Sequence, residues 1–458
     1  MRTLTTKRTP PREPRVGWHP FMALAILAVA GCTSNVTPAV SSASPETIPQ
    51  PIVDGLAVAP ASERVDLTMP TFTHPTEVTN PLFPVSAQRS VLFLGHVDGE
   101  PFRTEVTLLP FTRIVEWQGQ RVETLVSQYM AYLDGRIQEV AYDLYAQADD
   151  GSVWYFGEDV SDFQDGAIVT KEGTWLAGKD APAAMIMPAH PSVGDVYRTE
   201  NSPGFAFEEV TVTAVDRTLR GPIGPIQGGL VGQELHMDGK TEDKQFAPGY
   251  GEFYTADGPD VEALALAVPT DATDRPAPQP ASMEAASFRV LDAARSGDWP
   301  AASDGIAELV RAWGSMPVNE VPRLVAPRMT AAVRTLSDAV HGRDPVRSQQ
   351  AAIDVAQLSL DLGLRHTAVE DVDLARMDLW TRQLILDAAS EDAAAVSGDV
   401  FTLGYIRDRI LAALHEPHLT SVNTLLQHLQ VAAADGDLAR AGAEARALHR
   451  ELISLDGA

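Results

Sequence analysis

A short segment, Met185-Ile186-Met187-Pro188-Ala189-His190, combines two thioethers and one imidazole within six residues. Thioether and imidazole ligands together suit Cu(I), so Met185, Met187 and His190 are a candidate site for a soft metal ion. His236-Met237 is a second pair of the same kind. Methionine more often fills a gap in a core than binds a metal, so the alternative is that both methionines pack inside a sheet.

Glu158 and Asp159 are adjacent carboxylates and form a second candidate site. Two acids beside one cleft could divide the general acid and general base roles of a hydrolase, as in glycan hydrolysis. Neighbouring residues of a strand point to opposite faces, which argues against a direct partnership of these two. A hydrolase would require Glu158 or Asp159 to line a pocket together with another acid.

The sequence motifs of several large enzyme classes do not occur in this chain. It has no G-x-S-x-G, no G-x-x-x-x-G-K-[ST], no G-x-G-x-x-G opening a helix, no H-E-x-x-H and no C-x-x-C. With a single cysteine it cannot hold a cysteine-ligated metal cluster or a haem attached through C-x-x-C-H. We therefore expect no cofactor, and we favour a non-catalytic role.

The first 31 residues have the layout of a secretory signal, with a basic stretch, the apolar run 21–30, and then Gly31 and Cys32. The apolar run has 10 residues, about half of what a helix needs to cross a bilayer. Its end, V-A-G-C at 29–32, resembles the lipobox of bacterial lipoproteins. That resemblance implies that Cys32 is acylated and becomes the new N-terminus. An ordinary signal peptide that happens to end in cysteine is the alternative.

Charge and anchoring together define the expected surroundings of the protein. The chain has 62 acidic and 35 basic residues, for a formal charge of −27. Such a surface repels phosphate backbones, so we expect no nucleic-acid partner. The lipid on Cys32 would hold the chain on a cell membrane, facing outside the cytoplasm. An acidic surface is typical of proteins that stay soluble outside the cell, although it would also attract cations.

Composition divides the chain into consecutive parts. The signal 1–31 is followed by a tether, 32–64, which is rich in Ser, Pro and Thr. Residues 65–269 read as a β-rich domain, and the Pro-rich segment 270–282 is a linker. Residues 283–458 are rich in Ala, Leu and Arg and read as an α-helical domain. The fold class is therefore α+β with two domains.

Asp-Gly pairs punctuate the β-rich part between short alternating or apolar runs. They occur at 98–99, 134–135, 150–151, 165–166, 238–239 and 257–258. Asp-Gly between alternating segments is a strong hairpin signal, because both residues accept positive φ. We therefore expect an antiparallel meander, curved into a partial barrel or arranged as a sandwich.

The helical part contains a weak internal repeat of short polar corners. They lie at 296–298, 341–344, 390–392 and 435–437, about 45 to 49 residues apart. Glycine suits the position after a helix, and aspartate suits the N-cap of the next one. The repeat predicts four helical hairpins, hence about eight helices, in a bundle or a short stacked array.

Several stretches of the β-rich part resemble a known group of sequences. They are YAQADDGSVWYFGEDV, GTWLAGKDAPAAMIMPAHPSVGDVY, KQFAPGYGEF and EALALAVPTD. Together they look like a group of uncharacterised exported bacterial proteins that share the Asp-Gly hairpin, the WYFGED strand end and the MPA-x-P-x-VGD loop. The resemblance supports a β-rich exported domain and implies no activity, substrate or catalytic residue.

The sequence favours an exported, lipid-anchored lipoprotein that acts as a non-catalytic binding or interaction module of the cell envelope. Its partner, a protein or a small molecule, is not identified by any motif. Helical arrays commonly present partner surfaces, which supports this interpretation. A soft-metal (copper) binding protein and a cell-envelope hydrolase are the alternatives.

Overall fold

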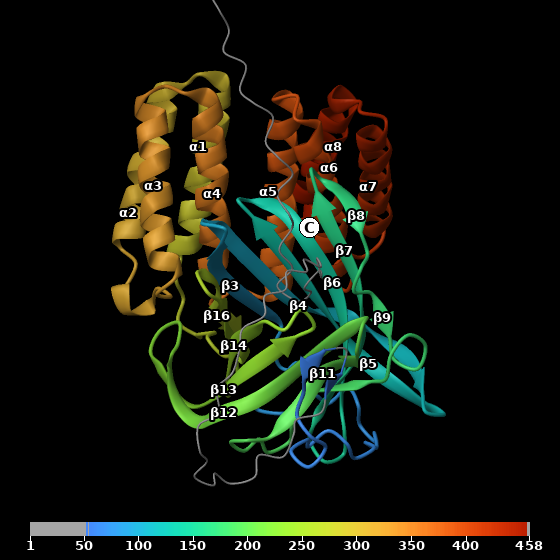
Figure 1. The fold of residues 1–458 in the computed structure, drawn as a ribbon. Coiled ribbons are helices and arrows are strands. Elements are labelled where there is room, and N and C mark those ends of the chain that lie inside the picture. The colour runs from blue at the N-terminus through green and yellow to red at the C-terminus, as the bar shows by residue number, and fades with distance from the viewer. Residues whose placement is uncertain (1–51, 54, 456–458) are drawn as a thin grey trace, which may run out of the picture.

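The computed structural model describes residues 52–53 and 55–455 (Figure 1). Strands occupy the chain up to Val268, and α-helices follow from Gln279 onward. The predicted α+β class, an antiparallel β-rich part followed by an all-α part, is confirmed. Cys32, the predicted lipidation site, lies outside the described residues.

The β-rich part forms one large antiparallel sheet and a separate two-stranded ribbon of β1 (Ile52–Val53) and β2 (Leu56–Ala57). The strands of the large sheet are β3 (Ser90–Val97), β4 (Glu100–Trp117), β5 (Gln120–Leu133), β6 (Arg136–Gln147), β7 (Val153–Gln164), β8 (Ala167–Thr170), β9 (Trp175–Leu176), β10 (Ala184–Met187), β11 (Val196–Ser202), β12 (Ala206–Arg220), β13 (Pro225–His236), β14 (Thr241–Ala247), β15 (Gly251–Asp257) and β16 (Asp260–Val268).

Two meanders build the large sheet. Strands β3 to β7 follow one another as neighbours, and so do β11 to β16. The meanders join where β3 pairs with β16, which gives the order β10-β7-β6-β5-β4-β3-β16-β15-β14-β13-β12-β11, with β8 and β9 both on β7. The edge strands β10 and β11 approach each other, but no ladder joins them in the described chain. The result is one strongly curved, open sheet.

The tight turns follow the Asp-Gly signal in part. Asp98, Asp134 and Asp165 adopt φ between 48° and 53°, and each is followed by a glycine with positive φ. Two consecutive positive φ angles define a type I′ turn, whose twist matches that of the paired strands. Gln118-Gly119, between β4 and β5, has the same conformation without an aspartate, so the sequence signal missed this turn.

The chain packs on the sheet before the first long strand begins. Val58 is buried, and the N–H of Ala59 donates to a carboxylate oxygen of Glu209. Arg64 forms an isolated bridge with Val196 of β11. These residues fall in the range 32–64 that the sequence assigns to the tether, so its last residues are part of the folded β-rich part.

The all-α part consists of helical hairpins at the predicted corners. Gly297 takes the left-handed conformation that ends one helix, and Asp298 caps the next by accepting from the N–H of Ala301. Asp344, Asp392 and Asp437 accept in the same way at the other corners. The helices are α1 (Gln279–Ser296), α2 (Trp299–Gly314), α3 (Val325–His341), α4 (Pro345–Gly363), α5 (Val369–Ala389), α6 (Ala393–Arg409), α7 (His418–Ala434) and α8 (Leu438–Leu455), with a short 3-10 helix at Val318–Glu320.

The helices form two groups, α1 to α4 and α5 to α8, which lie side by side over the sheet (Figure 1). The first group shares an apolar core with Leu92 and Leu266 of β3 and β16. The second group contacts β5 and β7, where Trp380 stacks on Tyr132 with ring centroids 5.3 Å apart. None of the described helices is both long enough and apolar enough to span a membrane.

The segment between the sheet and α1 is fixed to both parts. Asp271 accepts hydrogen bonds from the Tyr250 hydroxyl and from the N–H of Ala267, at 2.8 and 2.9 Å. The guanidinium of Arg365 donates to the carbonyl of Asp271 at 3.0 Å. The predicted linker 270–282 therefore contacts both the sheet and the helices, and α1 begins inside it.

The two faces of the sheet have different neighbours. Successive side chains of a strand point to opposite faces, so each strand contributes to both. In β3, Leu92 and Leu94 point outward to the helices, whereas Val91 and Phe93 point into the curve. The outer face is thus covered by α-helices, and the inner face surrounds a space of its own.

Candidate functional site

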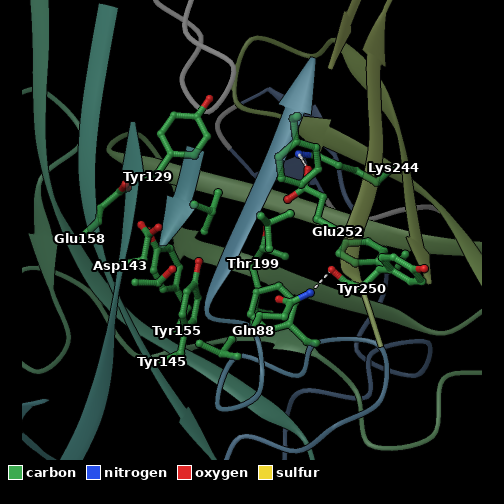
Figure 2. Close-up of a pocket in the computed structure, with 18 of the residues that line it drawn as sticks. Gln88, Tyr129, Asp143, Tyr145, Tyr155, Glu158, Thr199, Lys244, Tyr250 and Glu252 are labelled. Carbon is green, nitrogen blue, oxygen red and sulfur yellow. Dashed lines mark hydrogen bonds and ion pairs between the residues drawn. The ribbon is translucent and has the colours of Figure 1, made fainter. Parts of the chain in front are cut away.

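A cavity of about 120 Å³ lies inside the curve of the sheet (Figure 2). Strands of both meanders form its wall, and the segment 83–88 closes one end. Lys244 is the one basic residue that lines it in the described chain. The acidic lining residues are Asp143, Glu158, Glu200, Glu208, Glu234, Glu252 and Glu262.

Glu158 and Asp159, the adjacent acids noted in the sequence, lie on opposite faces of β7, because successive side chains of a strand alternate in direction. Glu158 is buried and lines the cavity. The side chain of Asp159 is 50% exposed on the other face, where it forms an ion pair with Arg113. The structure therefore does not bring these two carboxylates together.

Glu158 instead meets Glu200, which comes from β11 in the other meander. The two carboxyl groups are within hydrogen-bonding reach, and Glu200 also accepts the indole N–H of Trp175 at 3.1 Å. Burial, and then the charge of Glu200, raises the pKa of Glu158 well above its ordinary value. Burial, and then the charge of Glu208, does the same to the pKa of Glu200. Because two touching buried carboxyls cannot both ionise readily, the pair holds at least one proton at neutral pH.

Aromatic rings stand beside a third acid, Asp143 of β6. The hydroxyl of Tyr155 donates to Asp143 at 2.8 Å, and burial raises the pKa of Asp143 to about 7. Tyr145 stacks on Tyr155 with ring centroids 5.0 Å apart, and the edge of Phe83 meets Tyr145 at 5.1 Å. This side of the cavity combines acidic and aromatic side chains.

The opposite side of the cavity carries its positive charge. The ammonium of Lys244 lies 3.3 Å from a carboxylate oxygen of Glu234 and 3.2 Å from one of Glu252. A lysine this deeply buried is stabilised in its charged form by such neighbours. Burial lowers the pKa of Lys244, but the charges of Glu234 and Glu252 outweigh that effect and raise it well above its ordinary value.

His236 lies next to this group, between two glutamates. Its Nδ1 is 3.2 Å from Oε1 of Glu208, and its Nε2 is 3.2 Å from Oε2 of Glu242. Burial lowers the pKa of His236, but its hydrogen bonds to Glu208 and Glu242 outweigh burial and raise the pKa to about 11. Glu208, Glu234 and His236 offer ligand atoms that all lie within 4.8 Å of one another.

The residues proposed for Cu(I) lie elsewhere. Met185 and Met187 on β10 are buried in the apolar core of the sheet. His190 is exposed at a bend after the strand. The structure thus places the two thioethers in a core and the imidazole on the surface, and the copper hypothesis stays a prediction.

Sequence reasoning missed most of the cavity acids, because no motif joins them. Glu200, Glu208 and Glu234 belong to three different strands. One signal was available: ionisable residues at alternate positions of otherwise apolar strands, as at Glu234 and His236 of β13. His236 was noted only for its neighbour Met237, which lies in the turn after β13.

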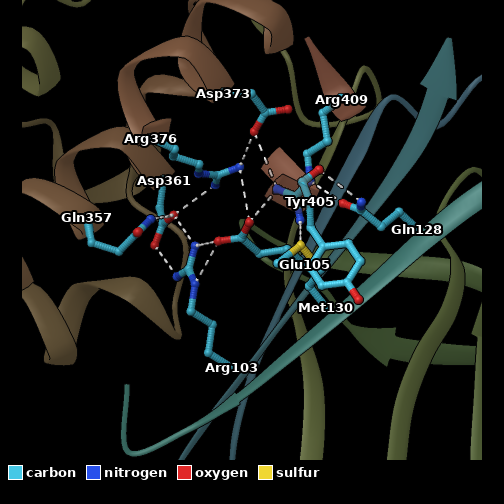
Figure 3. Close-up of polar contacts among 10 residues, drawn as sticks. All are labelled: Arg103, Glu105, Gln128, Met130, Gln357, Asp361, Asp373, Arg376, Tyr405 and Arg409. Atoms are coloured by element: carbon cyan, nitrogen blue, oxygen red, sulfur yellow. Dashed lines mark hydrogen bonds and ion pairs between the residues drawn. The ribbon is translucent and has the colours of Figure 1, made fainter. Parts of the chain in front are cut away.

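A second cluster of buried charges lies between the sheet and the helices (Figure 3). Glu105 of β4 accepts from Arg103 and from Arg409, each at 2.6 Å, and lies 3.7 Å from Arg376. Burial raises the pKa of Glu105, but the charges of Arg376, Arg103 and Arg409 outweigh it, so the pKa falls well below its ordinary value. We name this cluster the interface network, and its members are Arg103, Glu105, Asp361, Asp373, Arg376 and Arg409.

The interface network is balanced within itself. Asp361 contacts two arginines at 2.7 and 3.1 Å, and Asp373 contacts two at 3.0 and 3.5 Å. Three carboxylates thus face three guanidinium groups, whose planar forks suit such pairing. Because the six side chains come from β4, α4, α5 and α6, the network fixes the helices on the sheet. We assign it a structural role.

No protein-family model matches the chain, and no curated protein is significantly similar to it. The chemistry of the cavity is therefore inferred from its own residues.

Proposed function

We propose that this protein is a lipid-anchored, non-catalytic binding module of the cell envelope, and that its cavity binds a small cation. The observation that carries the proposal is the excess of acid in the cavity, where the described chain contributes seven carboxylic acids and one lysine to the lining. Buried carboxylates repel one another and lose hydration, so an arrangement of this kind is costly without a positive partner. A bound cation supplies that partner.

The size of the cavity limits the ligand. A volume of about 120 Å³ is near that of engineered cavities that hold a single benzene molecule. The ligand is then a metal ion or an organic ammonium of roughly six heavy atoms.

Isothermal titration of the purified mature protein tests the proposal. The probes are Zn²⁺, Mn²⁺, Ca²⁺ and tetramethylammonium, each as the chloride. We expect one of them to bind with one site per chain, and Glu158→Gln to weaken binding about tenfold, because it removes a carboxyl group that can give up its proton when a cation binds. Asp159→Asn is the matched control, since the neighbouring carboxylate lies outside, and it should leave affinity unchanged. Binding by none of the probes, or equal effects of both substitutions, would contradict the proposal.

The lipid anchor has its own test. Cys32→Ala removes the only acylation site that the lipobox resemblance implies, so we expect the variant to be released from membranes or left unprocessed. Membrane fractionation with a high-salt wash measures this. A variant that still sediments with membranes after the wash would contradict the anchor.

One observation favours a hydrolase as a second candidate function. Glu158 lines the cavity with a second acid, Glu200, within hydrogen-bonding reach. Touching carboxyls are closer than the roughly 5 Å of retaining glycosidases, and they resemble the shared-proton pair of aspartic proteases instead. Cleavage of denatured casein near pH 5 that Glu158→Gln abolishes and Asp159→Asn preserves would favour the hydrolase. Absence of cleavage favours the binding module.

A further inference from the structure

Three side chains on neighbouring strands bring potential metal ligands together at one side of the cavity. Glu208 of β12 lies directly opposite His236 of β13 in the ladder. Glu234 precedes His236 by two residues and therefore points to the same face. Two carboxylate oxygens and one imidazole nitrogen thus lie within 4.8 Å of one another in the interior.

The orientation of His236 suits coordination. Its Nε2 faces Glu242 at 3.2 Å, and a metal-bound histidine usually donates its other N–H to such a carboxylate. That contact leaves Nδ1 for an ion, with Oε1 of Glu208 already 3.2 Å away. Two ligands of a tetrahedral ion at about 2.0 Å are roughly 3.3 Å apart, so this pair has the required spacing. Glu234 offers the third ligand atom, within 4.8 Å of the other two.

A buried hydroxyl beside these residues has no partner. Tyr197 of β11 is fully buried, and its hydroxyl forms no hydrogen bond within the part of the chain that the structure describes. Tyr197 pairs with Val210 of β12, which pairs with Glu234 of β13, so Tyr197 and Glu234 lie in one row on the same face of the sheet. A buried polar group left without a partner costs about 1–3 kcal/mol. A bound ion, or a water on that ion, would satisfy it.

Local charge supports a divalent ion. The carboxylates of Glu208, Glu234, Glu242 and Glu252 face two basic groups, His236 and Lys244, so acids exceed bases by two. A divalent ion bound at these ligands reduces that excess. Mixed carboxylate and imidazole ligands suit first-row transition ions better than Mg²⁺ or Ca²⁺, which prefer oxygen alone.

We infer that Glu208, Glu234 and His236 form a site for a first-row divalent transition ion such as Zn²⁺, with Glu242 orienting the imidazole. This inference rests on the proposed cation-binding function and names the class of cation. It places the ion on the Lys244 side of the cavity, away from the buried methionines of β10.

Equilibrium dialysis of the full mature protein against Zn²⁺, after removal of metal with EDTA, is the test. We expect one Zn²⁺ per chain, a loss of affinity of at least about a hundredfold in His236→Gln and Glu208→Gln, and about a tenfold loss in Glu242→Gln. Asp159→Asn is the control, because its carboxylate lies on the other face of the sheet, and it should leave the affinity unchanged. Near-ultraviolet circular dichroism establishes that each variant is folded. If His236→Gln does not fold, the visible spectrum of the Co²⁺-loaded wild type decides, because tetrahedral nitrogen and oxygen ligation has its own signature.

The outcomes separate this inference from the proposed function. Stoichiometric Zn²⁺ that is lost in His236→Gln and kept in Asp159→Asn supports the site. Binding of tetramethylammonium without any binding of Zn²⁺ overturns the site and leaves the cation-binding module standing. Zn²⁺ that is lost in Met185→Leu with Met187→Leu, and retained in His236→Gln, also overturns it. If none of Zn²⁺, Mn²⁺, Ca²⁺ and tetramethylammonium binds, both the site and the proposed function are wrong.

Discussion

The cavity and the interface network both bury many charged side chains, but they balance them differently. In the interface network every carboxylate contacts at least two arginines, and acids and bases are equal in number. In the cavity a single lysine stands among seven acidic lining residues. Buried charge that the chain neutralises itself serves the architecture. Buried acids that the chain does not pair with bases hold protons or a positive ligand, and they mark the place where a cation is expected.

The two clusters also respond to pH in opposite directions. The folded pKa of Glu105 lies below its ordinary value, so its contribution to stability is present above that value, near 4.5, and is lost as the pH falls. The folded pKa of Asp143 is raised from 3.8 to about 7. The native state therefore holds a proton that the unfolded chain releases, and stability declines as the pH rises from about 4 to 7.

The largest change in stability is expected when one charge is removed from the interface network. Arg376→Met leaves Glu105, Asp361 and Asp373 with too little positive charge in a buried place, and we expect it to lower the free energy of unfolding by about 3–5 kcal/mol. Urea denaturation at pH 7 measures it. Arg295→Met, which removes an exposed ion pair with Asp292, is the control and should change stability by no more than about 0.5 kcal/mol. A loss below about 1 kcal/mol in Arg376→Met would show that the interface network is not a structural element.

In the cavity, removal of an ionisable group is expected to change stability by a smaller amount and to increase it. The groups that act on Asp143 are Tyr155, which donates to it, and the nearby carboxylate of Glu252. Asp143→Asn keeps the acceptor for Tyr155 and removes the ionisation, so we expect it to stabilise the protein by about 2 kcal/mol at pH 8 and very little at pH 4. Urea denaturation between pH 4 and 8 measures both. Asp159→Asn should leave the pH dependence unchanged, and an equal response of the two variants would remove the distinction between cavity and surface.

The smallest effect concerns the methionines of β10. If Met185 and Met187 only fill the core, Met185→Leu with Met187→Leu nearly conserves volume and costs no more than about 1.5 kcal/mol. Thermal unfolding, together with elemental analysis after Cu(I) exposure, measures both sides of the question. Stoichiometric copper that the double variant loses would establish the thioether site and weaken the claim that the acidic side of the cavity is the cation site.

Local chemistry made much of the fold predictable. The Asp-Gly hairpins and the corner at Gly297-Asp298 depend on residues that are adjacent in the sequence, and their conformations follow from φ preferences and capping. Strand alternation likewise predicted that Glu158 and Asp159 point apart. These features required no knowledge of the tertiary structure.

The candidate site could not be predicted in the same way. It exists because β3 pairs with β16, Ser90 opposite Val268, and because the sheet then curves until the two meanders face each other. Glu158 meets Glu200 only through that curvature, and Arg103 meets Asp361 across 258 positions. No local pattern encodes such long-range pairings, so acids on separate strands carried no sign of a common cavity.

The central claim, that a cation occupies the acidic cavity and not the balanced interface network, is tested most directly by anomalous X-ray diffraction from crystals grown with Zn²⁺. The account predicts a peak about 2.0–2.1 Å from Nδ1 of His236, next to Glu208, and no peak beside Glu105. A peak at the interface network, or a cavity without a peak in crystals that carry Zn²⁺ elsewhere, would contradict it.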